Sequence, residues 1–126
     1  MVITDITQLS EECNTWKKTL RSQREALASC NNNLQQLAAK NLDRKNLLDV
    51  EHFQNQFHIQ LINVHDLKHA IKDHEKIAEW ELVKNNGVFS DATWAAHEDL
   101  FDQYTQLEHT LQDLKTDFEK FTKTMA

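Results

Sequence analysis

Histidine is the residue type in this chain best suited to chemistry, and five of the seven histidines lie between residues 52 and 74. His65 and His69 are four residues apart, which places both imidazoles on one face of a helix, where they could bind one metal ion. Carboxylate-bridged di-metal bundles use a Glu-x-x-His motif on each of two helices. The segments before and after the histidine-rich one offer no matching motif. We therefore expect no metal site and no cofactor, and His65 and His69 are the pair that a metal ion would use if one binds.

The same histidines also suit a contact surface. Val50, Phe57, Val64 and Ile71 recur every seven residues and mark the side of the helix that faces a core. The side turned away from them carries a mixed set of residues, namely His58, Ile59, Ile62, His65 and His69. Isoleucines among histidines favour a face that contacts a partner protein or a second copy of the chain. The alternative is an ordinary solvated surface.

Polar residues also fall within the apolar stripes. Gln23 lies in one stripe, and His74 and His97 lie on or beside others. Polar residues at such positions set the register of packed helices more often than they catalyse. No nucleophile–base pair and no pair of carboxylates is visible, so we expect no enzymatic activity.

The two cysteines, Cys13 and Cys30, are expected to be small buried hydrophobic residues. A reactive thiol would need exposure and a cationic neighbour, and Lys17 is the candidate neighbour of Cys13. On one helix the cysteines stand roughly 25 Å apart, which is too far for a disulfide.

Aromatic residues gather near one predicted turn. Trp80, Phe89 and Trp94 lie at the end of one segment, in the connection and at the start of the next. We expect them at one end of the molecule, either as a plug that seals the core or as an exposed docking patch.

Three segments position these residues, and each has an apolar stripe with steps of three and four residues. The first stripe has Gln23 as its one polar position and contains Val2, Ile6, Leu9, Cys13, Trp16, Leu20, Leu27, Cys30, Leu34 and Leu37. The second contains Val50, Phe53, Phe57, Leu61, Val64, Leu67, Ile71 and Ala78. The third contains His97, Leu100, Tyr104, Leu107, Leu111, Leu114, Phe118, Phe121 and Met125. These stripes predict helices over about 4–40, 44–85 and 91–125.

Capping residues support these bounds. Thr4 or Asp5 could cap the first helix, Asp43 the second and Ser90 the third. Asn85-Asn86-Gly87 predicts the end of the second helix. The stripe changes phase across residues 41–43, which predicts a tight turn. One continuous helix through this point is the alternative, since no glycine or proline interrupts it.

The fold that these helices predict is all-α. Glycine occurs once and proline is absent, which excludes turn-rich β folds and glycine-rich phosphate loops. Short connections make neighbouring helices antiparallel, so residues 1–126 are expected to form one antiparallel three-helix coiled-coil bundle. With Trp16 in the first stripe, this arrangement resembles a spectrin-type repeat at the level of architecture. Trp94 lies at the start of the third helix rather than in its interior.

The formal net charge of −6 disfavours binding to nucleic acid or to anionic lipid. No signal-peptide pattern and no transmembrane stretch is visible, and two cysteines suit a reducing compartment, so we expect a cytoplasmic protein. A thin bundle is expected to lack a pocket for a small-molecule substrate. The predicted function is a non-enzymatic protein–protein interaction or structural module, with a homodimer through the His/Ile face as its self-associating form. The alternative is a metal-binding or metal-responsive bundle that uses His65 and His69.

Overall fold

A computed structural model describes residues 6–40, 42–85 and 87–125 of the chain. They form three helices, α1 (Ile6–Ala38), α2 (Arg44–Lys84) and α3 (Asp91–Met125), and the described residues contain no strand. The prediction of an all-α, three-helix bundle is confirmed. α1 ends two residues before its predicted end. The predicted start at residue 4 and the caps Thr4 and Asp5 lie outside the described residues.

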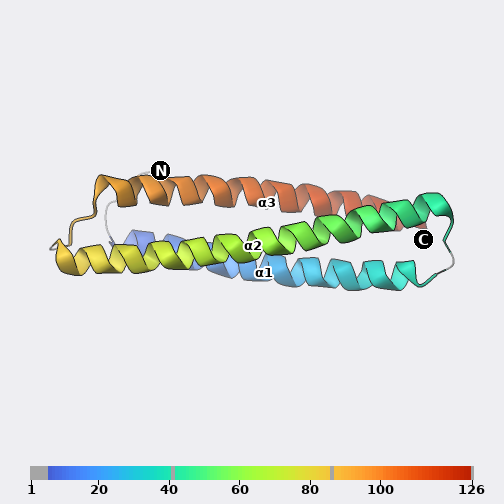
Figure 1. The fold of residues 1–126 in the computed structure, drawn as a ribbon, viewed down its shortest axis with the longest axis horizontal. Coiled ribbons are helices and arrows are strands. Elements are labelled where there is room, and N and C mark those ends of the chain that lie inside the picture. The colour runs from blue at the N-terminus through green and yellow to red at the C-terminus, as the bar shows by residue number, and fades with distance from the viewer. Residues whose placement is uncertain (1–5, 41, 86, 126) are drawn as a thin grey trace.

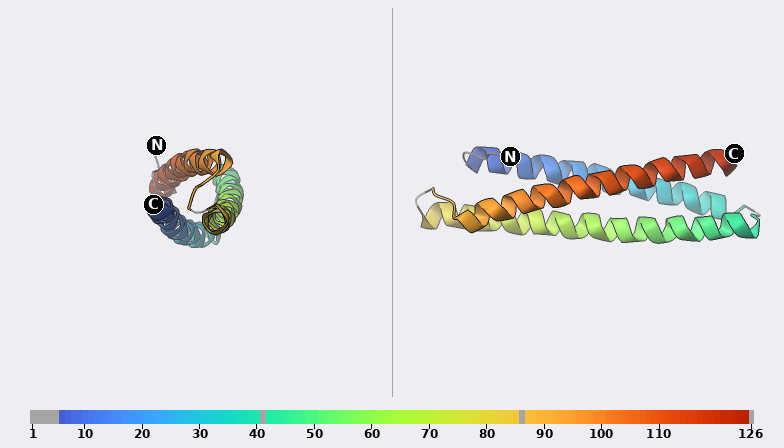
Figure 2. Two further views of the ribbon diagram at one scale, coloured as in Figure 1. Left: turned by 90° about the vertical axis from the view of Figure 1, so that its left-hand side faces the viewer. Right: turned by 90° about the horizontal axis from the view of Figure 1, so that it is seen from above.

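The three helices form a long, thin bundle (Figure 1). In this view α1 and α3 run from left to right, and α2 runs back between them. Viewed along its length, the bundle shows three helices around a common axis (Figure 2). Side-chain contacts agree with these helix directions, because they join the starts of α1 and α3 and join the start of α2 to the end of α3. Glu12 of α1 lies 3.2 Å from His97 near the start of α3. The rings of Phe53, near the start of α2, and Phe121, near the end of α3, lie 5.2 Å apart.

The chain turns between α1 and α2 where the phase of the stripes changes. α1 ends at Ala38, and the N–H of Ala39 still donates to the carbonyl of Gln35 at 3.1 Å. Asp43 caps α2, because its carboxylate accepts the N–H of Asn46 at 2.8 Å. The alternative of one continuous helix is therefore wrong. Residue 41 lies outside the described residues.

The turn between α2 and α3 uses the one glycine of the chain. Gly87 has φ of +84°, a left-handed conformation that residues with a Cβ atom rarely adopt. Its N–H donates to the carbonyl of Leu82 at 2.9 Å and closes the end of α2. Ser90 caps α3, since its hydroxyl accepts the N–H of Thr93 at 3.2 Å. The predicted cap is confirmed.

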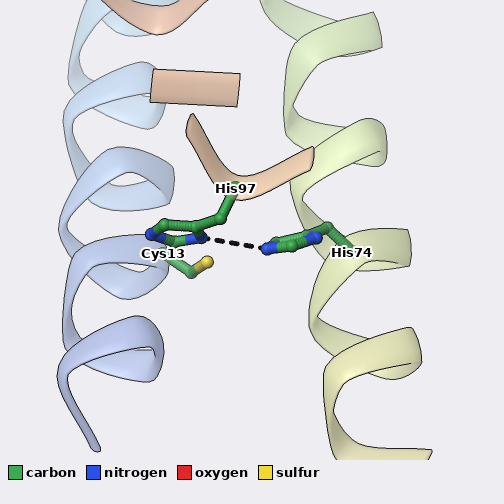
Figure 3. A group of neighbouring side chains, drawn as sticks. All are labelled: Cys13, His74 and His97. Atoms are coloured by element: carbon green, nitrogen blue, oxygen red, sulfur yellow. Dashed lines mark hydrogen bonds between the residues drawn. The ribbon is translucent and has the colours of Figure 1, made fainter. Parts of the chain in front are cut away.

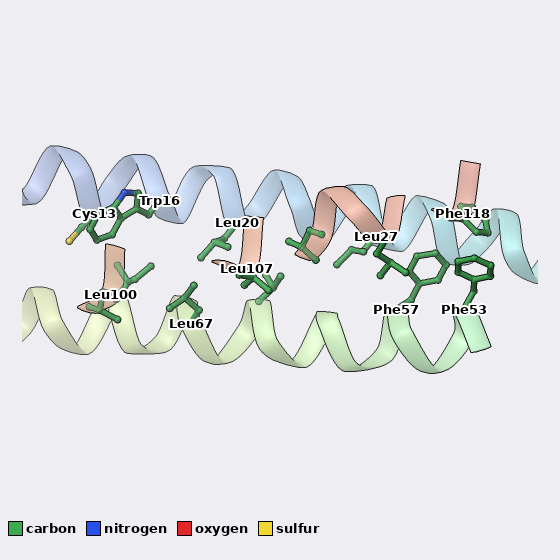
Figure 4. Close-up of a cluster of buried hydrophobic side chains, with 14 of the residues drawn as sticks. Cys13, Trp16, Leu20, Leu27, Phe53, Phe57, Leu67, Leu100, Leu107 and Phe118 are labelled. Atoms are coloured by element: carbon green, nitrogen blue, oxygen red, sulfur yellow. The ribbon is translucent and has the colours of Figure 1, made fainter. Parts of the chain in front are cut away.

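The apolar stripes form the core, and their side chains point toward the common axis (Figure 4). Trp16 lies toward one end, and Phe53, Phe57 and Phe118 lie toward the other. One predicted stripe position is wrong. At this level of α2 Gln60 is buried, whereas Leu61 is half-buried and packs against the edge of the core. The buried positions of α2 alternate in steps of three and four from Val50, and that register reaches residue 60.

All three helices carry charged side chains along their length. Within the described part of the chain, none of the helices contains a stretch that is long and apolar enough to cross a membrane.

Candidate functional site

Three potential metal ligands from three different helices meet near one end of the core. They are Cys13 of α1, His74 of α2 and His97 of α3 (Figure 3). One ligand atom from each lies within 4.8 Å of the others, and all three residues are buried. Among the described residues, no other group of three or more His, Cys, Asp or Glu side chains converges in this way.

The two histidines are joined by hydrogen bonds in a chain that ends at a carboxylate. His74 Nε2 lies 2.9 Å from His97 Nδ1, and His97 Nε2 lies 3.2 Å from Glu12 Oε2. Because the carboxylate can only accept, the bond requires a proton on Nε2 of His97. In the neutral ring Nδ1 is then the acceptor, and His74 donates to it through Nε2. Trp16 stacks on His97 with ring centroids 4.8 Å apart and holds the plane of that ring.

Burial sets the protonation of this group. Burial lowers the pKa of His74, and the nearby His97 lowers it further. Burial raises the pKa of the Cys13 thiol to about 12, with a further contribution from Glu75. At neutral pH the group therefore contains a neutral His74 imidazole and a protonated thiol.

The cysteines behave largely as expected. Cys13 is fully buried, as predicted, and Cys30 is half-buried rather than buried. Lys17 lowers the pKa of the Cys13 thiol, but burial and then Glu75, which pairs with Lys17 at 2.6 Å, outweigh it and leave the pKa raised. The hypothesis of a reactive thiol at Cys13 is therefore wrong.

The sequence does not reveal that His74 and His97 meet Cys13. One signal is present in the sequence: all three residues lie on or beside the apolar stripes. Side chains that can bind a metal are unusual at such core positions. The three residues meet because they lie at the same height along the bundle axis. The apolar stripes do not specify how far each helix is shifted along that axis relative to the others.

A second buried polar group closes the same end of the bundle. The Glu81 carboxylate accepts the hydroxyls of Ser90 and Thr93, each at 2.5 Å. It also lies 3.4 Å from the N–H of Ser90. The hydrogen bonds from Ser90 and then Thr93 lower the pKa of Glu81. These bonds tie the end of α2 to the cap of α3, which is a structural task.

Gln23, the polar residue of the first stripe, joins α1 to α3. Its amide donates to Glu108 at 3.1 Å and accepts from the Lys115 ammonium at 2.5 Å. Both partners lie on α3 and fix the level of one helix against the other. This agrees with the predicted role in register.

The predicted His/Ile face lies on the outside of α2. All five of its residues are exposed: His58, Ile59, Ile62, His65 and His69. The His65 and His69 rings are neighbours, with centroids 4.5 Å apart. Exposed large hydrophobic residues are unevenly distributed over the described chain. All belong to α2 or to the connection after it: Leu47, Leu48, Ile59, Ile62, Ile77, Trp80, Val83 and Val88.

The predicted aromatic end patch is divided in the structure. Phe89 is buried, and its ring meets that of Trp94 edge-on at 5.3 Å. These two residues seal the core. Trp80 remains 61% exposed, with the Lys84 ammonium 5.8 Å from its ring centroid. The three residues therefore do not form one exposed surface.

Cationic side chains from two helices gather beside Lys68 of α2. The pKa of Lys68 is lowered first by partial burial and then by Arg21 of α1, Lys72 of α2 and Arg24 of α1. Lys68 thus lies in a locally cationic environment on a chain whose net charge is −6. The net charge of the chain does not reveal this grouping.

The expectation that the bundle lacks a hollow of ligand size needs correction. A groove of about 590 Å³ lies between α2 and α3, within the usual range for small-molecule sites. Polar side chains line much of it, among them Gln60 and Asp66 of α2 and Gln103, Gln106 and Thr110 of α3. Ligand pockets are mostly apolar, so the lining is not typical of one.

Comparisons of the chain with family models, with curated proteins and with solved structures found no match. The assignment of function therefore depends on the geometry of the described residues.

Proposed function

We propose that this protein is a non-enzymatic helical association module, and that the outer face of α2 contacts a second copy of the chain. The contact face is the His/Ile face, His58, Ile59, Ile62, His65 and His69. The observation that carries the proposal is the confinement of exposed large hydrophobic residues to α2 and the connection after it. α1 and α3 turn their described large apolar side chains inward, so α2 is the helix with apolar surface left to bury.

Charge restricts where a second copy can bind, and the His/Ile face is suited to that contact. Two copies of a chain with net charge −6 repel each other over most of their surfaces. The five residues of the His/Ile face carry no formal charge when the imidazoles are neutral. A two-fold contact brings like residues together, and an uncharged face avoids the repulsion that this would otherwise create.

Two finer features belong to the same proposal. Stripes with steps of three and four residues support knobs-into-holes packing of a coiled coil within each bundle.

Cys13 and Cys30 are free thiols, which suit a reducing compartment, and we place the protein in the cytoplasm.

Sedimentation velocity over a range of protein concentrations tests the proposal. We expect a reversible dimer in the wild-type chain and a monomer in Ile62→Asp, because the carboxylate cannot be buried against its own copy. Ser29→Asp adds the same charge at an exposed position of α1 and should leave the dimer unchanged. A monomeric wild type at high concentration would contradict the proposal, as would an Ile62→Asp variant that still dimerises.

A second candidate function is a metal-responsive assembly through His65 and His69. Their ring centroids lie 4.5 Å apart on the exposed face, and they provide two ligands per chain. A second copy would have to complete the coordination of the ion. We expect Zn²⁺ to strengthen the dimer of the wild type but not that of a His65→Gln/His69→Gln variant. Equal dimerisation of the two proteins with and without Zn²⁺ would exclude this candidate.

A further inference from the structure

We infer that Cys13, His74 and His97 form a buried binding site for a divalent transition-metal ion of borderline softness, with Zn²⁺ as the first ion to test. The site lies inside the bundle and is distinct from the exposed pair His65 and His69. Each ligand comes from a different helix, so one ion would fasten α1, α2 and α3 at a single level (Figure 3). The inference does not depend on the association of two copies.

The distances suit such an ion. Zn²⁺ binds cysteine sulfur at about 2.3 Å and histidine nitrogen at about 2.0–2.1 Å, so ligand atoms around a tetrahedral ion stand roughly 3.3–3.8 Å apart. The two imidazole nitrogens are 2.9 Å apart, and all three ligand atoms lie within 4.8 Å. Binding needs a small separation of the two rings and a small inward movement of the sulfur.

The surroundings have the form of a metal site's outer shell. Histidines that bind metals usually donate their second ring nitrogen to a carboxylate, which fixes the ring and its tautomer. His97 already has this arrangement, because its Nε2 bonds to Glu12 while its Nδ1 faces the group. The stacked Trp16 ring adds a second restraint on the orientation of His97.

The local charge also favours a cation. Glu75 and Glu12 lie close enough to Cys13 to disfavour its thiolate, and the same negative potential attracts a divalent ion. One thiol and two imidazoles form a donor set typical of zinc and its neighbours in the periodic table, rather than of Mg²⁺ or Ca²⁺. The side chain of Glu12 is about one-fifth exposed, so the site lies directly beneath the surface.

Binding is a ligand exchange without electron transfer. The ion forms bonds with Cys13 Sγ, His74 Nε2 and His97 Nδ1 and releases all but one of its bound water molecules. The thiol proton leaves to solvent, and the proton on His74 moves from Nε2 to Nδ1. The hydrogen bond between the two rings is lost. A water molecule would occupy the fourth position.

Titration with Co²⁺ tests the site, because a thiolate ligand produces a charge-transfer band in the near ultraviolet and tetrahedral Co²⁺ absorbs in the visible. The protein used is the full chain without an affinity tag, in the Cys30→Ala background, where Cys13 is the only thiol. We expect both bands at one Co²⁺ per chain, and loss of both bands when Zn²⁺ is added. Absence of the charge-transfer band in this folded protein would overturn the inference.

Two further variants locate the ion. Cys13→Ala should lose the charge-transfer band, whereas His65→Gln/His69→Gln should retain it. Saturation with Zn²⁺ at a hundredfold excess over Kd should raise the midpoint of thermal unfolding by about 10 °C in Cys30→Ala. His74→Gln should lose this increase while keeping its helical circular dichroism. A band that survives in Cys13→Ala, or an equal increase in His74→Gln, would contradict the assignment.

Discussion

Glu81 illustrates how a single buried charge can close one end of a helical bundle. Its two oxygens accept the hydroxyls of Ser90 and Thr93, and both partners lie beyond the turn. A carboxylate buried without such donors would be strongly destabilising. The bonds therefore stabilise the charged form of Glu81 and the α2–α3 junction together.

Glu81→Gln should lower the stability of the fold at pH 7, because an amide offers one acceptor oxygen to two hydroxyl donors. The hydrogen bonds hold the pKa of Glu81 below its ordinary value of 4.5, so their contribution is complete above that pH and is lost as the pH falls below it. The difference in unfolding midpoint between wild type and variant should narrow from pH 7 to pH 3.5. Urea denaturation followed by circular dichroism at both pH values measures this difference.

Glu79→Gln is the matched control for this measurement, since Glu79 is exposed on the same helix. It should unfold like the wild type at pH 7. An equal loss in the two variants would show that the Glu81 bonds do not contribute to stability.

The sequence shows which core positions hold polar residues, but it does not show which contacts those residues make. The sequence predicts a role in register for His74, His97 and Gln23, and the bonds of Gln23 to Glu108 and Lys115 agree with that prediction. The histidines instead form a hydrogen-bonded pair beside a thiol. The position of a residue within its own helix predicts whether it is buried. Which residue it contacts depends on how the other helices are aligned with that helix, so the histidine pair could not be predicted.

At the scale of the helices, most boundaries follow from local chemistry. Asp43 and Ser90 accept backbone N–H groups that have no partner in the first turn of a helix. Gly87 adopts a positive φ after the end of α2. These interactions join residues fewer than six positions apart, so they can be found from the sequence.

Asp43→Ala should destabilise the protein by about 1 kcal/mol, because the N–H of Asn46 loses its acceptor at the start of α2. Glu51→Ala removes the same charge from an exposed position of the same helix and should have a much smaller effect. Chemical denaturation at neutral pH measures both free energies. Equal losses would indicate a charge effect rather than a capping bond.

At the scale of the whole molecule, a long thin core raises the question of whether the two ends unfold together. The ring of Trp16 lies beside His97, and the Phe53, Phe57 and Phe118 rings cluster farther along the bundle (Figure 4). The chain of buried side chains between them is continuous, and helices of this length gain most of their stability from such packing.

Leu111→Ala should therefore destabilise the entire bundle by about 2–5 kcal/mol, since Leu111 is fully buried and its removal leaves a cavity. Tryptophan fluorescence reports on the end that contains Trp16, whereas circular dichroism reports on all three helices. Both signals should shift to the same lower midpoint. Leu48→Ala, at an exposed position of α2, is the control. Separate midpoints for the two signals would show that the ends unfold independently.

The sequence by itself determined the helices, their order and their inward faces. Alternating steps of three and four residues fix which side of a helix is apolar, and burial of that side is the dominant gain in free energy. Local signals also located the break between α1 and α2 and the end of α2. The exposed His/Ile face followed from the same periodicity, since it lies opposite the stripe.

The tertiary structure alone decided which residues of different helices lie at the same level. That alignment depends on how side chains interdigitate across the core and on the path of each connection, and no periodicity within one helix contains it. It brings Cys13, His74 and His97 together and leaves Trp80 exposed while Phe89 and Trp94 pack against each other.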